Sequence, residues 1–242
     1  KRILLEAREA TRPTIVATEM LHSMIGHSAP TKAEVSDITN AVLDGASALM
    51  LSGETAIGKY PVEAVATMRR IADRVTSHAQ AAQDLEQGAD TKSVPRAVED
   101  AIALICRRLP VTKIVAVTLS GYAARALAMR MPRQPILAVT NDPALARSLN
   151  LLPGVEGVSL DIRFPRTSLR HIPVCLRSLW RAGRLQDEDL IVVTTVGYPA
   201  AGNLMNLIEI HTWRTWPARC AGRAPTGWWP PDEPAGPSPV HV

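Results

Sequence analysis

Residues capable of proton chemistry follow two short apolar runs near the start of the chain. Thr18 and Glu19 close a first run at residues 14–18, and Ser52 and Glu54 follow a second run of the same kind. Because an alcohol is a weak acid, Thr18 would pass a proton through a water molecule or a relay. From the residues alone, a threonine hydroxyl that satisfies backbone groups at a strand end is the favoured interpretation.

Two helices are predicted between and after these runs. A capping-box pattern, Thr31 to Glu34, predicts a helix that ends near Asp44-Gly45, with glycine in the left-handed position. A second helix begins at Tyr60-Pro61. On that helix we expect one buried face, because apolar residues recur at helical spacing. These residues are Val65, Met68, Ala72 and Val75.

A second region of the chain alternates helices and strands. Residues 77–92 are polar and are expected to connect the two regions. The strands predicted after them span residues 113–118, 135–140, 155–160, 190–195 and, as an edge strand, 207–211. Helices are expected between them, one of which opens at Asp142-Pro143 with a good cap. This alternation predicts an α/β domain with a mostly parallel sheet.

Composition excludes several classes of function. The net charge of +4 comes from scattered basic residues, and only 4% of residues are aromatic, so we expect no nucleic-acid partner. The longest apolar run is far shorter than the roughly 20 residues that span a bilayer, so no membrane partner is expected. The three cysteines lie far apart in the sequence, which favours a reduced, cytoplasmic compartment and no metal site of their own.

The two ends of the chain differ from the rest. Residues 214–242 contain seven prolines and three tryptophans without periodicity, which predicts a disordered tail. The chain opens on Lys1 within a helical pattern, which suggests a piece of a longer protein.

The first region resembles the pyruvate kinase family closely, over about 50 residues in the family's order and spacing. The matching segments are Val16-Ala17-Thr18-Glu19-Met20-Leu21, Pro30-Thr31-Lys32-Ala33-Glu34-Val35-Ser36-Asp37, Asn40-Ala41-Val42-Leu43-Asp44-Gly45, Met50-Leu51-Ser52-Gly53-Glu54-Thr55-Ala56 and Gly58-Lys59-Tyr60-Pro61. The resemblance covers about residues 1–213. It implies the last two βα units of a (β/α)8 barrel in residues 1–76 and the family's C-terminal, allosteric α/β domain in residues 93–213.

The same resemblance implies roles for the polar residues. In such barrels the active site lies at the C-terminal ends of the strands. Thr18 matches a threonine near the substrate that is implicated in delivering a proton to the enolate. Ser52 and Glu54 match a second signature and are expected to support Thr18, although a structural role for Glu54 is an equal alternative. Glu19 is expected to lie at the substrate.

Two residues depart from the family's pattern. Glu19 replaces a glutamine, and its carboxylate would repel an anionic substrate unless it is paired or protonated. Lys32 replaces an arginine that lies at a subunit contact in the family, and lysine cannot reproduce the bidentate arginine fork. We expect regulation of the tetramer to differ as a result.

The C-terminal domain carries two loops that match effector-binding loops of the family. Thr118, Ser120 and Gly121 precede a helix, whose N-terminus favours phosphate, and capping of that helix by Ser120 is the alternative. Gly197 and Gly202 belong to the second loop, which contains no arginine or lysine. A tight bisphosphate site is therefore not expected; the hypothesis is a weaker or different phosphorylated effector, or none.

The expected function follows from the resemblance. It implies part of a glycolytic kinase that transfers phosphate from phosphoenolpyruvate to ADP, yielding pyruvate and ATP, in a homotetramer. Mg2+ and K+ are the implied cofactors, with their ligands upstream of this segment and no metal ligands within it. Alone, the chain is expected to be inactive. The alternative is a noncatalytic module that binds a phosphorylated effector or completes a barrel.

Overall fold

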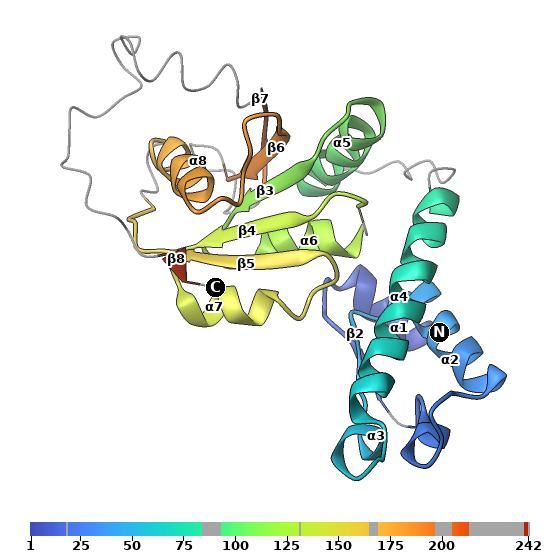
Figure 1. Ribbon diagram of the computed structural model, residues 1–242. Helices are drawn as coiled ribbons and strands as arrows, with labels where there is room; N and C mark the ends of the chain where they lie inside the picture. The colour runs from blue at the N-terminus through green and yellow to red at the C-terminus, as the bar shows by residue number, and fades with distance from the viewer. Residues whose placement is uncertain are drawn as a thin grey trace. The chain divides into compact units, whose positions relative to one another are not determined.

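The computed structural model describes residues 1–17, 19–83, 93–130, 132–164, 169–196, 205–212 and 240–241. The chain divides into two compact units (Figure 1). Unit 1 comprises Lys1–Gln87 with Leu151–Pro153, and unit 2 comprises Gly88–Asn150 with Gly154–Val242. Each unit is described by itself below.

Unit 1 contains two short parallel strands and the helices around them. Its elements are α1 (Arg2–Glu9), β1 (Ile15–Val16), the 3-10 helix η1 (His22–Ile25), α2 (Lys32–Leu43), β2 (Ala48–Leu49), α3 (Gly53–Ala56) and α4 (Pro61–Gln83). Strands β1 and β2 pair in parallel, with Ile15 opposite Ala48 and Val16 opposite Leu49. The two strands therefore run in the same direction and end side by side.

Helix α2 begins and ends as its sequence predicts. The Thr31 side chain accepts a hydrogen bond from the Glu34 backbone N–H, and the Glu34 carboxylate accepts one from the Thr31 N–H, which completes the capping box. At the other end Gly45 has φ +87, a left-handed conformation that suits glycine. Ile38, Ala41 and Val42 of α2 are buried in the core of unit 1.

Helix α4 buries most of the expected face, with one exception. Met68 is buried, and Ala72 and Val75 pack against the same core, but Val65 is 52% exposed. Ala64 takes the place of Val65 in the core, because its position puts it on the same stripe as Met68 and Ile71. Helix α4 also continues to Gln83, so the first part of the expected connection is helical.

Unit 2 is built on a six-stranded sheet in the order β7-β6-β3-β4-β5-β8. The strands are β3 (Lys113–Val117), β4 (Ile136–Thr140), β5 (Val155–Leu160), β6 (Leu190–Thr195), β7 (Leu207–Thr212) and β8 (Val240–His241). The pairs among β6, β3, β4 and β5 are parallel, and the two outer strands are antiparallel to their neighbours. The prediction of a mostly parallel sheet is therefore confirmed.

The helices of unit 2 are α5 (Val94–Arg108), α6 (Tyr122–Met129), α7 (Pro143–Leu149) and α8 (His171–Arg181) (Figure 1). Alternate residues of the central strands form one core with α8, because successive side chains of a strand point to opposite faces. On the strands this core includes Val115, Val117, Leu137, Val139, Val158 and Leu160, and on α8 it includes Ile172, Leu176 and Leu179. Helices α6 and α7 contact strands β3, β4 and β5.

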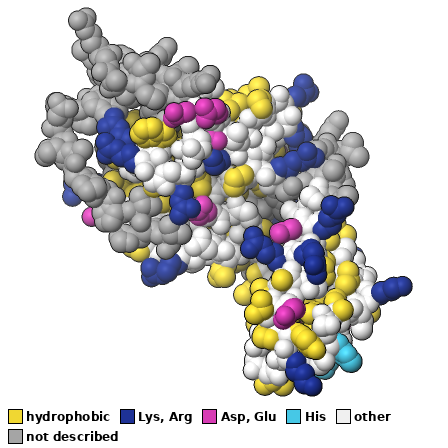
Figure 2. Space-filling model, viewed as in Figure 1, with side chains coloured by type: hydrophobic (Ala, Val, Ile, Leu, Met, Phe, Trp, Pro, Cys, Tyr) yellow, Lys and Arg dark blue, Asp and Glu magenta, His cyan; other side chains and the backbone are white. Residues whose placement is uncertain are grey.

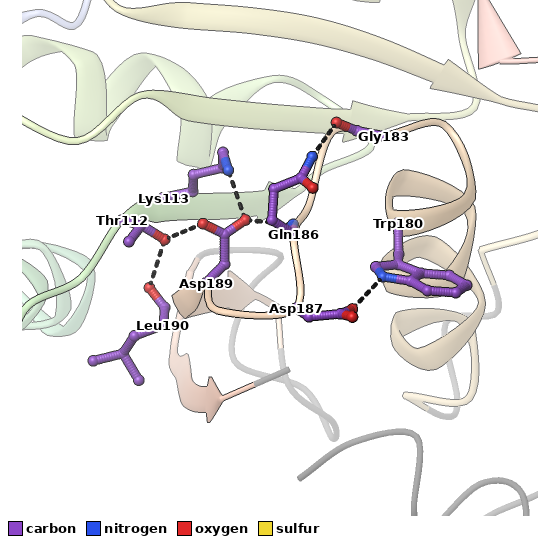
Figure 3. A network of polar contacts seen from close by, with 8 residues as sticks. All are labelled: Thr112, Lys113, Trp180, Gly183, Gln186, Asp187, Asp189 and Leu190. Carbon is purple, nitrogen blue, oxygen red and sulfur yellow. Dashed lines mark hydrogen bonds and ion pairs between the residues drawn. The ribbon is translucent and has the colours of Figure 1, made fainter. Parts of the chain in front are cut away.

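A polar network centred on the buried Asp189 joins the start of β3 to the start of β6 (Figure 3). The Asp189 carboxylate accepts hydrogen bonds from the Thr112 hydroxyl at 2.7 Å, the Lys113 ammonium at 2.6 Å and the Gln186 backbone N–H at 2.7 Å. Burial raises the pKa of Asp189, but these donors outweigh it and hold the pKa below its usual range. Asp189 therefore remains ionised and ties two neighbouring strands together.

The end of the chain differs from the expected disordered tail at two residues. Val240 and His241 form β8, which pairs with Leu160 and Ser159 of β5. Without β8, β5 would be the edge of the sheet, and an edge strand has unpaired backbone groups with which another strand can pair. Residues 213–239 and 242 lie outside the described residues.

Candidate functional site

The carboxyl ends of β1 and β2 lie next to each other in unit 1. The parallel register continues beyond the strands, because the Met50 N–H donates to the Val16 carbonyl at 2.9 Å. The segments that follow the two strands, at residues 17–19 and 50–54, therefore leave from the same edge. Thr18, the expected proton-delivering residue, lies outside the described residues.

Glu54 joins the segments that follow the two strands. Its Oε1 accepts a hydrogen bond from the Leu21 backbone N–H at 2.9 Å, and its Oε2 accepts one from the Ser52 N–H at 2.8 Å. Glu54 is only 2% exposed; its hydrogen bond to Leu21 is buried and the one to Ser52 is partly buried. The segment after Thr18 is thus fixed to the segment after β2 by one carboxylate.

The electrostatics of Glu54 suit an acceptor that holds backbone in place. Burial raises its pKa, but the N–H groups of Leu21, of Glu54 itself and of Ser52, together with the nearby His22, outweigh burial and lower the pKa below its usual range. The carboxylate is therefore ionised at neutral pH. Both oxygens already accept backbone hydrogen bonds, so this geometry favours a positioning role over proton donation.

The other two expected residues of this site have different surroundings. Glu19 is exposed and has φ +43, a left-handed conformation that is uncommon for a residue with a side chain. Such conformations cost on the order of 1–3 kcal/mol and cluster at functional sites. Ser52 is exposed, and its carbonyl accepts bonds from the first turn of α3.

The expected effector loop of unit 2 lies after β3, where the sheet order changes direction. Strand β3 has β4 on one side and β6 on the other, and such a switch point at the carboxyl ends of parallel strands is a common ligand site. Thr118 is 7% exposed, and its hydroxyl accepts a hydrogen bond from the Gly121 N–H at 2.9 Å. The loop is therefore pinned by Thr118 before α6 begins.

Ser120 and Gly121 complete this turn. The Ser120 hydroxyl accepts a long hydrogen bond of 3.4 Å from the Tyr122 N–H, but the N-cap residue of α6 is Gly121, so the alternative that Ser120 caps the helix is wrong. Gly121 has φ +77, so a side chain there would be strained. Gly197 and Gly202, on the second expected effector loop, lie outside the described residues.

Sequence reasoning missed a cation beside this loop. The Arg125 guanidinium donates a hydrogen bond to the Ser120 carbonyl, and a Cβ atom on Gly121 would lie 2.9 Å from an Arg125 nitrogen. The spacing in the sequence could have predicted this contact. Arg125 lies four residues after Gly121, so it lies on the same side of the helix.

Within the described ranges, no group of three or more His, Cys, Asp or Glu side chains could hold a metal ion. None of the helices described is both long enough and apolar enough to cross a membrane.

Comparison with known proteins identifies the class to which this fold and site belong. The model of the pyruvate kinase barrel domain matches residues 1–65, and the model of the pyruvate kinase alpha/beta domain matches residues 96–211. The two models together cover both units in the order in which the chain presents them.

Individual relatives agree with the two models. Pyruvate kinase 2 of Synechocystis is 37% identical over 211 residues, which are 87% of this chain and 35% of that protein. Pyruvate kinase of Mycobacterium intracellulare is 40% identical over 216 residues, 87% of this chain and 44% of the relative. Pyruvate kinase of Geobacillus stearothermophilus is 39% identical over 203 residues, which are 81% of this chain and 34% of the relative. The chain belongs to the pyruvate kinase family, and it spans less than half the length of these relatives.

Proposed function

We propose that this chain supplies the C-terminal part of a pyruvate kinase, which transfers phosphate from phosphoenolpyruvate to ADP and yields pyruvate and ATP. In this proposal unit 1 forms the last two βα units of a (β/α)8 barrel, and unit 2 is the C-terminal domain. The observation that carries the proposal is the Glu54 carboxylate, which joins the segments after two parallel strands at the edge where a barrel has its active site.

The exposed apolar surface of unit 1 supports a larger barrel. Hydrophobic side chains reach the visible surface of this unit (Figure 2). Ile15 on β1 is 56% exposed and Met50, just after β2, is 44% exposed. Two strands leave open edges and faces that further strands and helices of a barrel would cover. We therefore propose that unit 1 is completed by other parts of a barrel.

The proposed chemistry of this chain is proton delivery. After phosphoryl transfer the enolate of pyruvate takes a proton at its methylene carbon. Thr18 would hold or relay that proton through a water molecule, because an alcohol is too weak an acid to donate directly at neutral pH. Glu54 holds the following segment, and the exposed Ser52 lies at the same edge. No step through Mg2+ or K+ is assigned to these residues.

Unit 2 is proposed to bind a phosphorylated effector weakly, to bind one different from a sugar bisphosphate, or to bind none. The loop of Thr118, Ser120 and Gly121 lies at the switch point of the sheet with Arg125 beside it. Sub-micromolar binding of fructose 1,6-bisphosphate in calorimetry would overturn this hypothesis. The homotetramer and the cytoplasmic location remain predictions, and the alternative of a noncatalytic module gains no support, because both matching models are pyruvate kinase domains.

A chimera tests the proposed reaction. Residues 1–213 replace the matching segment of the Geobacillus stearothermophilus relative, and pyruvate formation is followed with lactate dehydrogenase. We expect the chain alone to be inactive and the chimera to be active. Thr18→Ala should lower kcat by about 100-fold or more, the usual contribution of a proton-transfer residue. The control is Thr76→Ala, whose hydroxyl bonds only within α4. An unchanged kcat in the Thr18→Ala chimera would refute the role.

A further inference from the structure

The loop after β1 is held by more than Glu54. This loop, residues 20–27, contains the 3-10 helix η1, and its Leu21 and Met24 side chains are fully buried. These apolar anchors fix the depth of the loop in the core. Ser23 lies between these two anchors, and its backbone and polar side chain are held by hydrogen bonds instead.

Glu34, in the first turn of α2, supplies those hydrogen bonds. Its Oε1 accepts from the Ser23 backbone N–H at 2.7 Å, and its Oε2 accepts from the Ser23 hydroxyl at 2.6 Å. The same Oε2 accepts from the Thr31 N–H at 2.7 Å and the Thr31 hydroxyl at 2.9 Å. The Glu34 side chain therefore caps its own helix and also accepts hydrogen bonds from Ser23, 11 residues earlier in the chain.

We propose that Glu34 is a second positioning residue of the active-site edge and holds residues 20–27 together with Glu54. The inference rests on the proposed function for its catalytic meaning. The two carboxylates reach the loop from different helices, Glu54 from α3 at Leu21 and Glu34 from α2 at Ser23. Leu21 and Ser23, two residues apart, are therefore each held by a carboxylate from a different helix.

The chemistry of the contact requires a carboxylate. Four donors converge on Glu34, and an ionised carboxylate is an acceptor at both oxygens. Glutamine has one NH2 group, which in either orientation faces at least one of these donors. The N–H and O–H groups also hold the pKa of Glu34 below its usual range, although burial alone would raise it. Glu34→Gln is therefore a disruptive change in spite of its shape.

Hydrogen exchange measured by NMR on the full chain tests the grip on the loop. We expect Glu34→Gln to speed exchange of the Ser23 amide by at least about tenfold, as loss of a charge-assisted hydrogen bond would. Glu54→Gln should do the same at Leu21, and the exposed Glu63→Gln should change neither amide. Thr31→Ala separates the two roles of Glu34, since it removes the hydroxyl that accepts from the Glu34 N–H and leaves both hydrogen bonds from Ser23 to Glu34 in place. If it speeds Ser23 exchange as much as Glu34→Gln does, Glu34 is only a helix cap and the inference fails.

Kinetics of the chimera test the catalytic meaning. Glu34→Gln should lower kcat by about tenfold while the KM for ADP stays unchanged, since a misplaced proton donor slows a chemical step. A merely structural role would leave kcat unchanged at temperatures where the protein is folded, and that result would overturn the positioning role. Thr18→Ala in the same chimera reports on the proposed function separately. A large effect of Thr18→Ala with none of Glu34→Gln refutes only the present inference.

Discussion

Replacement of Glu54 by glutamine is expected to destabilise unit 1 by about 2 kcal/mol. One of the two backbone donors, Leu21 N–H or Ser52 N–H, would face an NH2 group. A hydrogen bond to a charged group contributes about 1.5–3 kcal/mol, and a buried donor left without a partner costs about 1–3 kcal/mol. Part of this loss is offset, because the neutral amide is less costly to bury than the carboxylate.

The effect should depend on pH in a defined direction. The folded-state pKa of Glu54 lies below its ordinary value of 4.5. Its contribution to stability is therefore present above about pH 4.5 and is lost as the pH falls through the folded-state pKa. The difference in the free energy of unfolding between the natural chain and Glu54→Gln should be largest near neutral pH and should decrease in acid.

The measurement is urea unfolding of the full chain. Unfolding of unit 1 is monitored by hydrogen exchange of its peptides, detected by mass spectrometry. Peptides of unit 2 serve as an internal reference, and Glu63→Gln, at an exposed position in the first turn of α4, is the matched control. Ordinary surface substitutions change the free energy of unfolding by up to about 0.5 kcal/mol. If Glu54→Gln changes it by no more than that, the reasoning is refuted. A difference that is the same at pH 4 and pH 7 would refute it as well.

Three further predictions concern unit 2. Asp189→Asn should destabilise it by about 3 kcal/mol, because Lys113 would be left partly buried without its partner; urea unfolding followed by tryptophan fluorescence measures this. Gly157→Ala should prevent native packing of β5, since the added Cβ would lie 1.9 Å from the Ala146 carbonyl oxygen; the dispersion of the NMR spectrum reports it. Burial raises the pKa of Cys106 to about 11, so alkylation of this thiol, mapped by mass spectrometry, should be about 100-fold slower than in the urea-unfolded chain.

Two of the three have a control variant, and each has a contrary outcome. Asp187→Asn changes an exposed carboxylate that accepts only the Trp180 ring N–H, and equal effects of the two Asp→Asn changes would contradict a special role of the Asp189 network. Gly26→Ala adds a methyl group where nothing lies within 4 Å, so it should be tolerated. A native-like spectrum of Gly157→Ala, or equally fast alkylation of folded and unfolded Cys106, would show that the packing argument is wrong.

Local signals predicted much of the architecture. Asp142 caps α7 through a 2.8 Å bond from the Ala144 N–H with proline at the next position, as the residues indicate. The β-branched apolar runs of unit 2 predicted its parallel strands because a buried parallel strand needs apolar residues on both faces. The capping box of Thr31 and Glu34 is likewise a short-range pattern.

The contacts that organise the candidate site were harder to predict. Glu54 and Leu21 are 33 residues apart, and Asp189 and Lys113 are 76 residues apart. Periodicity and capping rules describe neighbours within a few residues, so they carry no information about such partners. The left-handed conformation of Glu19 has no signal either, since the surrounding structure imposes it against the residue's own preference.

The 33-residue separation of Leu21 and Glu54 has a consequence for synthesis on the ribosome. The loop after β1 emerges before its carboxylate partner on α3 has been translated. At a translation rate of about 5–20 residues per second, Glu54 is synthesised roughly 2–7 s after Leu21. During that interval the nascent loop has its apolar anchors and not its hydrogen-bond acceptor, so it becomes ordered only after α3 has left the ribosome.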